Sequence, residues 1–214
     1  MKKKDASIWN KKAESYTRFS HDAHSFQSLI LGKIAQRGII FDKKSILDIG
    51  CGTGVYTLHI AKHALHVNAL DFSQEMLNIL HEDAIKEGLD KKFTFTCNTW
   101  SDFESDKDFD IVFSSMSPAF ESNADFEKMH HYARETCVFL GWGGKRESSL
   151  LDPIFKAHGK ALNVPAGSEK LRAWLELVAI PYESEYIEEK TLHVKTYEKA
   201  LSSVLWHFEI NNLT

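Results

Sequence analysis

The chain has 214 residues, of which 43% are hydrophobic, and a formal net charge of −4. This length and hydrophobic content predict one globular domain over residues 1–214. No run approaches the roughly 18 consecutive apolar residues of a membrane-spanning helix. No basic cluster suits a nucleic-acid backbone, so nucleic acid is disfavoured as a partner.

The first residues, Met1 to Lys4, are as basic as the start of a secretory signal, but the residues that follow are polar. The chain also has three cysteines, an odd number that does not suit a framework of disulfides. Both observations predict a cytoplasmic protein. The sequence does not indicate its oligomeric state.

Two segments before residue 40 carry apolar side chains at helical spacing. Residues 5–19 place Trp9, Ala13 and Tyr16 on one face, and residues 22–37 repeat the pattern. We expect two amphipathic helices that form an N-terminal cap over residues 1–40.

From Lys44 the pattern changes to short apolar runs separated by charged helical segments, which is typical of a parallel sheet buried on both faces. We predict a doubly wound, mostly parallel, Rossmann-like α/β core over residues 41–140. Strands are expected at 45–49, 66–70, 92–97, 109–114 and 135–140. Helices are expected at 54–64, 73–88 and 122–133, with Ser73 as the N-cap of the second.

After Leu140 the glycine-rich residues 141–144 interrupt any regular element. The segment 141–214 is predicted to be a helical, substrate-side insertion with the C-terminal elements, and no final strand is evident. Helices are expected at 148–158, 168–177 and 196–208, and a strand or hairpin at 182–194.

A hydrophobic strand that contains Asp48 runs directly into a turn with glycines at 50, 52 and 54. Glycines let the backbone pass close to a ligand, and the following helix offers free amides at its N-terminus. A dinucleotide pyrophosphate and the methionine part of S-adenosylmethionine both suit such a turn. The spacing G-x-G-x-G differs from the dinucleotide pattern G-x-G-x-x-G, and the carboxylate of Asp48 repels phosphates but suits a cation.

With this motif the sequence resembles the class I methyltransferase family, over roughly residues 40–140. Asp71 ends the second strand at the carboxyl edge of the sheet, where a carboxylate can accept both ribose hydroxyls. The resemblance implies that Phe72 packs on the adenine edge. It also implies an acidic residue at Asn98, whose side-chain oxygen is expected to replace it, with Thr99 and Trp100 giving stacking or backbone contacts.

The fourth strand ends at the same edge, so Ser114 and Ser115 are expected to face the methionine part of the cofactor, while Asp110 at its start is structural. The helix with Tyr16 resembles the lid of small-molecule methyltransferases. The predicted cofactor residues are therefore Asp48, Gly50, Cys51, Gly52, Gly54, Asp71, Phe72, Asn98, Thr99, Trp100, Ser114, Ser115 and Tyr16.

These features predict a methyltransferase that uses S-adenosylmethionine, releases S-adenosylhomocysteine and acts on a small-molecule acceptor. The segment Ser-Pro-Ala-Phe at 117–120 does not match the motif of enzymes that act on base or amide nitrogens. In-line transfer needs alignment and exclusion of water, but no obligatory catalytic residue, and none is assigned. A non-catalytic S-adenosylmethionine-binding protein and an NAD(P)-dependent oxidoreductase stay open as alternatives.

Other polar residues permit less definite interpretations. The candidates for a general base, should the acceptor need one, are His21, His24, His130 and His131. The pair His59 and His63 has a spacing seen in metal sites, but without a third ligand no metal is expected. Arg146, beside Trp142, either grips an acceptor carboxylate or lies in a solvated glycine-rich turn.

Overall fold

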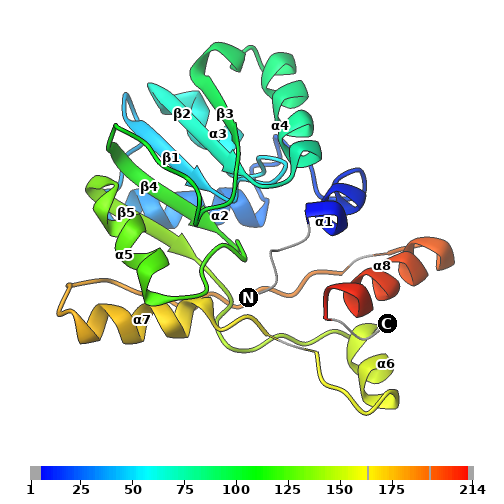
Figure 1. Cartoon of the computed structure of the whole chain (residues 1–214). Helices are drawn as coiled ribbons and strands as arrows, with labels where there is room; N and C mark the ends of the chain where they lie inside the picture. The colour runs from blue at the N-terminus through cyan, green and yellow to red at the C-terminus, as the bar shows by residue number, and fades with distance from the viewer. Residues whose placement is uncertain (1–5, 163, 193, 212–214) are drawn as a thin grey trace. The chain divides into compact units, whose positions relative to one another are not determined.

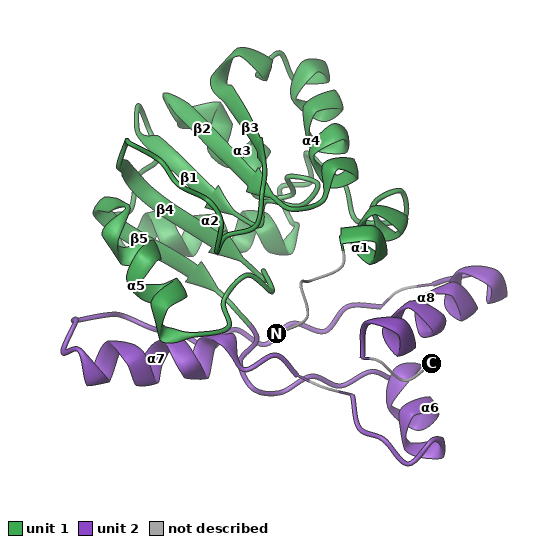
Figure 2. Ribbon diagram, in the orientation of Figure 1, with its two compact units in different colours: residues 1–141 green, residues 142–214 purple. Residues whose placement is uncertain are grey.

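The computed structural model describes residues 6–162, 164–192 and 194–211; residues 1–5, where the predicted cap begins, lie outside them. The chain divides into two compact units, Met1–Gly141 and Trp142–Thr214 (Figure 2). That all 214 residues act as one domain stays a prediction. None of the helices in the described ranges is long and apolar enough to cross a membrane.

The first unit contains a parallel sheet with the strand order β3-β2-β1-β4-β5 (Figure 1). Its strands are β1 Ser45–Ile49, β2 His66–Asp71, β3 Phe93–Cys97, β4 Phe109–Ser115 and β5 Ala133–Leu140. This confirms the predicted Rossmann-like α/β fold. In the register of β1 with its neighbours, Asp48 lies opposite Ala69 and Phe113. The carboxyl ends of β1, β2 and β4 therefore meet at one edge of the sheet.

Helices follow the strands as predicted, although each is shorter than expected. They are α3 Thr57–His63, α4 Gln74–Lys86 and α5 Asn123–His131; a short 3₁₀ turn that was not predicted, η1 Asp90–Lys92, precedes β3. Ser73 is the N-cap of α4, and its hydroxyl accepts a hydrogen bond from the amide of Met76. Right-handed crossovers place α5 on the face opposite α3 and α4, because β4 and β5 step away from β1 in the other direction.

The two faces of the sheet are buried by different side chains. Leu58 of α3 and Leu77 and Leu80 of α4 form one cluster with Ala69 of β2. The other cluster is aromatic, and its members are Trp100, Phe103, Phe120, Phe126, Tyr132 and Phe139. Cover on both faces explains why the central strands β1 and β4 are mostly buried and largely apolar.

The predicted first helix, 5–19, is wrong in its second half. Helix α1 spans Ala6–Ala13, and α2 spans Phe26–Gln36. The residues between them follow tertiary contacts instead of a helical path: the carbonyl of Thr17 accepts from the hydroxyl of Thr53 at 2.5 Å, and Arg18 pairs with Asp83 at 2.6 Å. Tyr16 therefore lies in a turn after α1 and not on a helix.

Gly54 is tightly constrained by a neighbour in the core. Its φ is +83°, and a Cβ placed there would lie 2.2 Å from Cδ1 of the fully buried Leu80. Gly54→Ala is therefore expected to lower the free energy of unfolding by about 2–4 kcal/mol, through left-handed strain and overpacking. Gly88→Ala is the control, since Gly88 has φ +66° but no neighbour within 4 Å, and should cost only about 1 kcal/mol. Urea unfolding measures both variants, and an equal decrease in the free energy of unfolding for Gly54→Ala and Gly88→Ala would show that the clash with Leu80 is not the cause.

Among its described residues, the second unit contains the helices α6 Leu151–Ala157, α7 Gly167–Leu177 and α8 Tyr197–Ile210. Leu151 and Phe155 of α6 pack against Val204 and Phe208 of α8. The predicted strand or hairpin at 182–194 is wrong for the residues that the structure describes there, because none of them forms a strand. Alternating apolar side chains predict a strand only where a neighbouring strand supplies hydrogen bonds.

Candidate cofactor site

The glycine turn after β1 has a backbone that only glycine adopts easily. Gly50, Gly52 and Gly54 all have positive φ, of +71°, +54° and +83°. The amides of Gly50 and Cys51 both donate to the carbonyl of Leu70, at 2.7 and 3.1 Å, and the amide of Gly54 donates to the carbonyl of Cys51 at 3.0 Å. These amides are therefore engaged within the protein and not directed at a bound anion.

Asp71 closes the turn from the end of β2. Its Oδ2 accepts from the amide of Gly52 at 2.9 Å, and its Oδ1 accepts from the amide of Ser73 at 2.8 Å. Burial raises the pKa of Asp71, while the backbone hydrogen bonds of Ser73, Gly52 and Phe72 act in the opposite direction. Each carboxylate oxygen has a second acceptor position, so the group still has capacity for ligand hydroxyls.

Asp48 is the second buried carboxyl group beside the turn. Its Oδ2 accepts from the hydroxyl of Thr57 at 2.6 Å, whereas Oδ1 has no hydrogen-bond partner among the described residues. Burial raises the pKa of Asp48 to about 7, the hydrogen bond from Thr57 lowers it, and the nearby charge of Asp71 raises it further. An unpaired buried acceptor next to a second carboxyl group favours a cationic ligand.

The end of β4 covers the glycine turn. A Cβ at Gly50 would lie 2.1 Å from Oγ of Ser117, so the side chain of Ser117 fits against the turn in this position only because residue 50 is glycine. Met116, just before Ser117, has φ +50°, a left-handed conformation that is strained for methionine. The sequence alone does not indicate this strain.

Three aromatic side chains, two of them from the N-terminal segment, form a group near Asp71. The ring of Trp9 lies 6.5 Å from that of Tyr16 and 6.4 Å from that of Phe72. Burial raises the pKa of Tyr16, and the charge of Asp71 adds to this, which places Tyr16 close to the carboxyl group. Tyr16 and Phe72 are thus brought together with Asp71, as the predicted site requires, although that they bind a cofactor stays a prediction.

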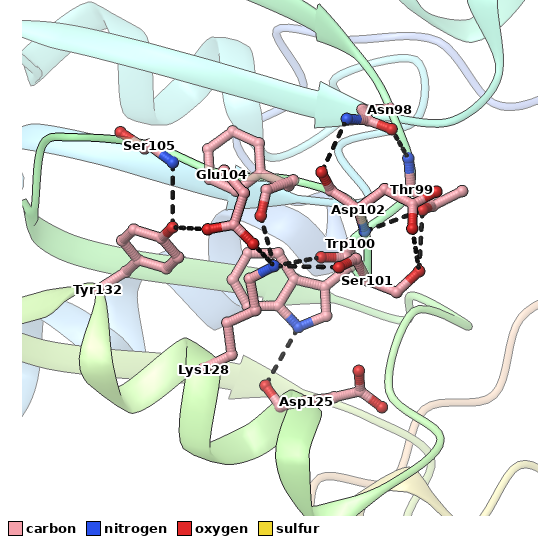
Figure 3. A network of polar contacts seen from close by, with 11 residues as sticks. Asn98, Thr99, Trp100, Ser101, Asp102, Glu104, Ser105, Asp125, Lys128 and Tyr132 are labelled. Carbon is pink, nitrogen blue, oxygen red and sulfur yellow. Dashed lines mark hydrogen bonds and ion pairs between the residues drawn. The ribbon is translucent and has the colours of Figure 1, made fainter.

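The loop after β3 carries Asn98, Thr99 and Trp100, and it is held by hydrogen bonds within the loop and with α5 (Figure 3). Oδ1 of Asn98 accepts from the amide of Thr99 at 2.9 Å, and its side-chain amide donates to the carbonyl of Asp102 at 3.2 Å. Trp100 is buried in the aromatic cluster, and its indole donates to the carbonyl of Asp125 at 3.1 Å. The side chain of Trp100 therefore serves packing, and Asn98 shapes the loop.

Lys128 of α5 holds this loop from below (Figure 3). Its ammonium donates to the carbonyls of Trp100 at 3.0 Å and Ser101 at 3.3 Å, and also to that of Phe103. It lies 3.6 Å from the carboxylate of Glu104 and 4.9 Å from the centre of the Trp100 ring. A partly buried cation thus binds three carbonyl groups of a loop that has no helix or strand.

Lys128→Met keeps the aliphatic stem but removes the donors, so we expect the free energy of unfolding to fall by about 1–3 kcal/mol. Lys86→Met is the control, because Lys86 makes an ion pair with Asp83 but is 63% exposed. Its loss should stay below about 1 kcal/mol. Urea unfolding of both variants measures the difference, and equal losses would show that the carbonyl contacts of Lys128 contribute little.

The two serines at the end of β4 differ in their surroundings. Ser114 is fully buried, and its hydroxyl donates to the carbonyl of Ile49 at 2.9 Å, whereas Ser115 is half-buried. Asp110, at the other end of the strand, accepts from the amide and the hydroxyl of Ser45, both at 2.8 Å. Asp110 thus ties β4 to β1 at the amino edge of the sheet, far from the glycine turn.

All four candidate bases are exposed to solvent. His130 and His131 end α5 immediately before β5 begins, so they lie toward the amino edge of the sheet. His21 contacts Glu87 at 2.9 Å. No group of three or more His, Cys, Asp or Glu side chains that could hold a metal ion occurs in the described ranges, and the pair His59 and His63 has no third member there.

Sequence reasoning missed four residues that shape the site: Thr57, which donates to Asp48; Thr53, which holds the N-terminal segment; Asn10, which accepts from the hydroxyl of Ser73 at 2.6 Å; and Lys128. Three of these four contacts join segments at least 27 residues apart. Only the position of Thr57, in the first turn of the helix that follows the glycines, is visible in a local pattern.

Comparisons with known proteins agree with this geometry. Residues 46–138 match the family model described as a methyltransferase domain. Among curated relatives, the chain is 30% identical to an uncharacterized protein of Haemophilus influenzae, over 71% of the chain and 55% of that protein. It is 30% identical to the cypemycin N-terminal methyltransferase of a Streptomyces species, over 61% of the chain and 53% of the relative. It is 27% identical to a phosphoethanolamine N-methyltransferase of Triticum aestivum, over 61% and 30%.

The chain thus spans about half or less of the length of these relatives. A solved structure from Methanococcus maripaludis, described as an S-adenosylmethionine-dependent methyltransferase, superposes with a TM-score of 0.57 at 19% identity, over 85% of this chain and 89% of that one. At this identity the superposition shows a shared fold. Residues 46–138 are thus similar to a methyltransferase domain, and the sheet order and the glycine turn after β1 agree with the fold of S-adenosylmethionine-dependent methyltransferases.

Proposed function

We propose that this protein transfers the methyl group of S-adenosylmethionine to a small-molecule acceptor by in-line displacement. The observation that carries the proposal is the pair of buried carboxyl groups, Asp48 and Asp71, beside a glycine turn in which the amides of Gly50, Cys51, Gly52 and Gly54 are already engaged. A pyrophosphate needs free amide donors and is repelled by carboxylates. A ligand with cationic ammonium and sulfonium groups suits the same surface, which favours S-adenosylmethionine over a dinucleotide.

The residues of the site fit this cofactor in their chemistry. Asp71 would accept the ribose hydroxyls, and the unpaired Oδ1 of Asp48 would face the cationic part directly or through water. Tyr16 and Phe72 would cover the bound ligand with aromatic surface and exclude water. When bound, the cofactor supplies a methyl group that its sulfonium already activates for displacement. The protein's contribution is then alignment and desolvation, for which no catalytic base is required.

A small-molecule acceptor is supported by the net charge and by the names of relatives. The charge of −4 disfavours a nucleic-acid substrate. The relatives include a phosphoethanolamine N-methyltransferase and ubiquinone biosynthesis O-methyltransferases, which are named for small acceptors on nitrogen and on oxygen. The acceptor atom of this protein is left open by that range.

The test is incubation of the purified protein with S-adenosylmethionine labelled on the methyl group and a metabolite extract, followed by separation of small molecules, protein and nucleic acid. Label in the small-molecule fraction is expected. Label in protein or nucleic acid alone would contradict the proposed acceptor class. If no label is transferred but S-adenosylhomocysteine raises the melting temperature of the protein, a non-catalytic binding protein is favoured. If only NADH raises the melting temperature, an oxidoreductase is favoured.

A further inference from the structure

The glycine-rich segment after β5 carries a half-buried arginine in the second unit. The guanidinium of Arg146 lies 4.9 Å from the centre of the Trp142 ring, and its Nη2 lies 3.3 Å from Nε2 of His207 on α8. Nδ1 of His207 must carry a proton, because it donates to the carbonyl of Ser203 at 2.7 Å. In neutral His207, Nε2 is therefore the acceptor for Arg146. These contacts overturn the interpretation of Arg146 as part of a solvated turn.

The charge of Arg146 is not neutralised by the groups that hold it. In the part of the chain that the structure describes, its contacts are an aromatic face and an imidazole, and no carboxylate forms an ion pair with it. Burial lowers the pKa of Arg146, and the charge of Asp152 opposes this effect. Of the five donors of a guanidinium, the described hydrogen bond occupies one. A desolvated, pre-oriented cation with spare donors is the arrangement that proteins use to bind oxyanions.

A second cation reaches the same turn of α8. The ammonium of Lys195 lies 3.3 Å from the hydroxyl of Ser203, the residue whose carbonyl orients His207. Lys195 is exposed, whereas Arg146 is half-buried and contacts both Trp142 and His207 of α8. Two positive side chains therefore approach one turn of α8 from different parts of the second unit.

We propose that Arg146, oriented by Trp142 and His207, binds the carboxylate or phosphate group of a small molecule. Carboxylate and phosphate each present a pair of oxygens that a guanidinium can bind with two parallel hydrogen bonds. Trp142 keeps the guanidinium plane fixed by stacking, so less side-chain freedom is lost on binding. The site needs no methyl donor, and its test is independent of the proposed methyl transfer.

The experiment titrates the whole protein with inorganic phosphate and, separately, with acetate, at constant ionic strength kept with chloride. NMR follows the guanidinium resonances of Arg146 and the indole resonance of Trp142. Saturable shifts are expected at both, and the probe with the lower dissociation constant identifies the group that the site prefers. Arg146→Met should weaken that binding at least tenfold. Lys145→Met should change it less than twofold, since Lys145 carries the same charge one residue away but is exposed and pairs with Glu147 at 3.0 Å.

Equal weakening in both variants would overturn the proposal, because general electrostatic attraction would then explain the binding. The absence of saturation with either probe would overturn it as well. Should Arg146→Met not fold, the titration of the unaltered protein decides: saturable shifts centred on Trp142 and Arg146 support the site, and shifts confined to other residues contradict it. Arg146→Lys, which keeps the charge but loses the planar donors, is expected to bind several-fold more weakly.

Discussion

Asp71→Ala is expected to weaken the binding of S-adenosylhomocysteine by about 1–3 kcal/mol, which is roughly 5-fold to 150-fold in affinity. Two losses combine: the acceptor for the ribose hydroxyls disappears, and the amides of Gly52 and Ser73 lose the carboxylate that positions the turn. Isothermal titration calorimetry on the ligand-free protein measures the effect directly.

Asp110→Ala is the matched control for this variant. Asp110 also binds a backbone amide of a neighbouring segment, that of Ser45, but it does so at the opposite edge of the same sheet. We expect Asp110→Ala to lower the free energy of unfolding without changing the affinity for S-adenosylhomocysteine. Unchanged affinity in Asp71→Ala, or an equal loss in both variants, would remove Asp71 from the cofactor site.

The second large effect is expected from Asp48, whose burial gives the ligand-free protein an unusual dependence on pH. Burial raises its pKa to about 7 in the folded protein, whereas an unfolded chain has the ordinary value of about 3.9. Because the folded state holds the proton more tightly, the contribution of Asp48 to stability is complete below pH 4. It is lost as the pH rises through 7, by up to about 4 kcal/mol in total.

Asp48→Asn has no such titration, so the stability of the unaltered protein relative to this variant should fall by about 2–3 kcal/mol between pH 5 and pH 8. Urea unfolding of both proteins without ligand, at several pH values in this range, measures that difference. The comparison at each pH removes the titration of all other groups that the two proteins share.

Asp110→Asn is a control of the opposite sign. The hydrogen bonds from the amide and hydroxyl of Ser45 lower the pKa of Asp110, so its contribution is lost only as the pH falls below its ordinary value. The difference in the free energy of unfolding between the unaltered protein and Asp110→Asn should therefore not change between pH 5 and pH 8. A flat difference for Asp48→Asn as well would show that Asp48 is ionised throughout this range and that its burial does not hold a proton.

The central strands β1, β2 and β4 were predictable because their residues are mostly buried, on both faces of the sheet. A strand of that kind is a short apolar run whatever its neighbours are, and the five runs from β1 to β5 occur in the described sheet within two residues of the predicted bounds. The secondary structure of segments outside the sheet was less predictable. The helix expected through residue 19 ends at Ala13, and the alternating residues 182–192 form no strand, because the partners of both segments are set by the rest of the chain.

The sequence by itself determined the glycine turn, Asp48 and Asp71, because their spacing is local and their chemistry excludes most other ligands. Only the tertiary structure decided how these groups are satisfied. Thr57 pairs with one oxygen of Asp48 and leaves the other unpaired, Lys128 fixes the loop after β3, and Trp142 and His207 hold Arg146. The contact between Thr57 and Asp48 joins residues that are close in the sequence. The contacts of Lys128 and of His207 join residues that are far apart in the sequence and that only the fold brings together. Hydrogen bonding and burial act over a few ångströms in space, and sequence spacing predicts such distances only within a single turn or helix.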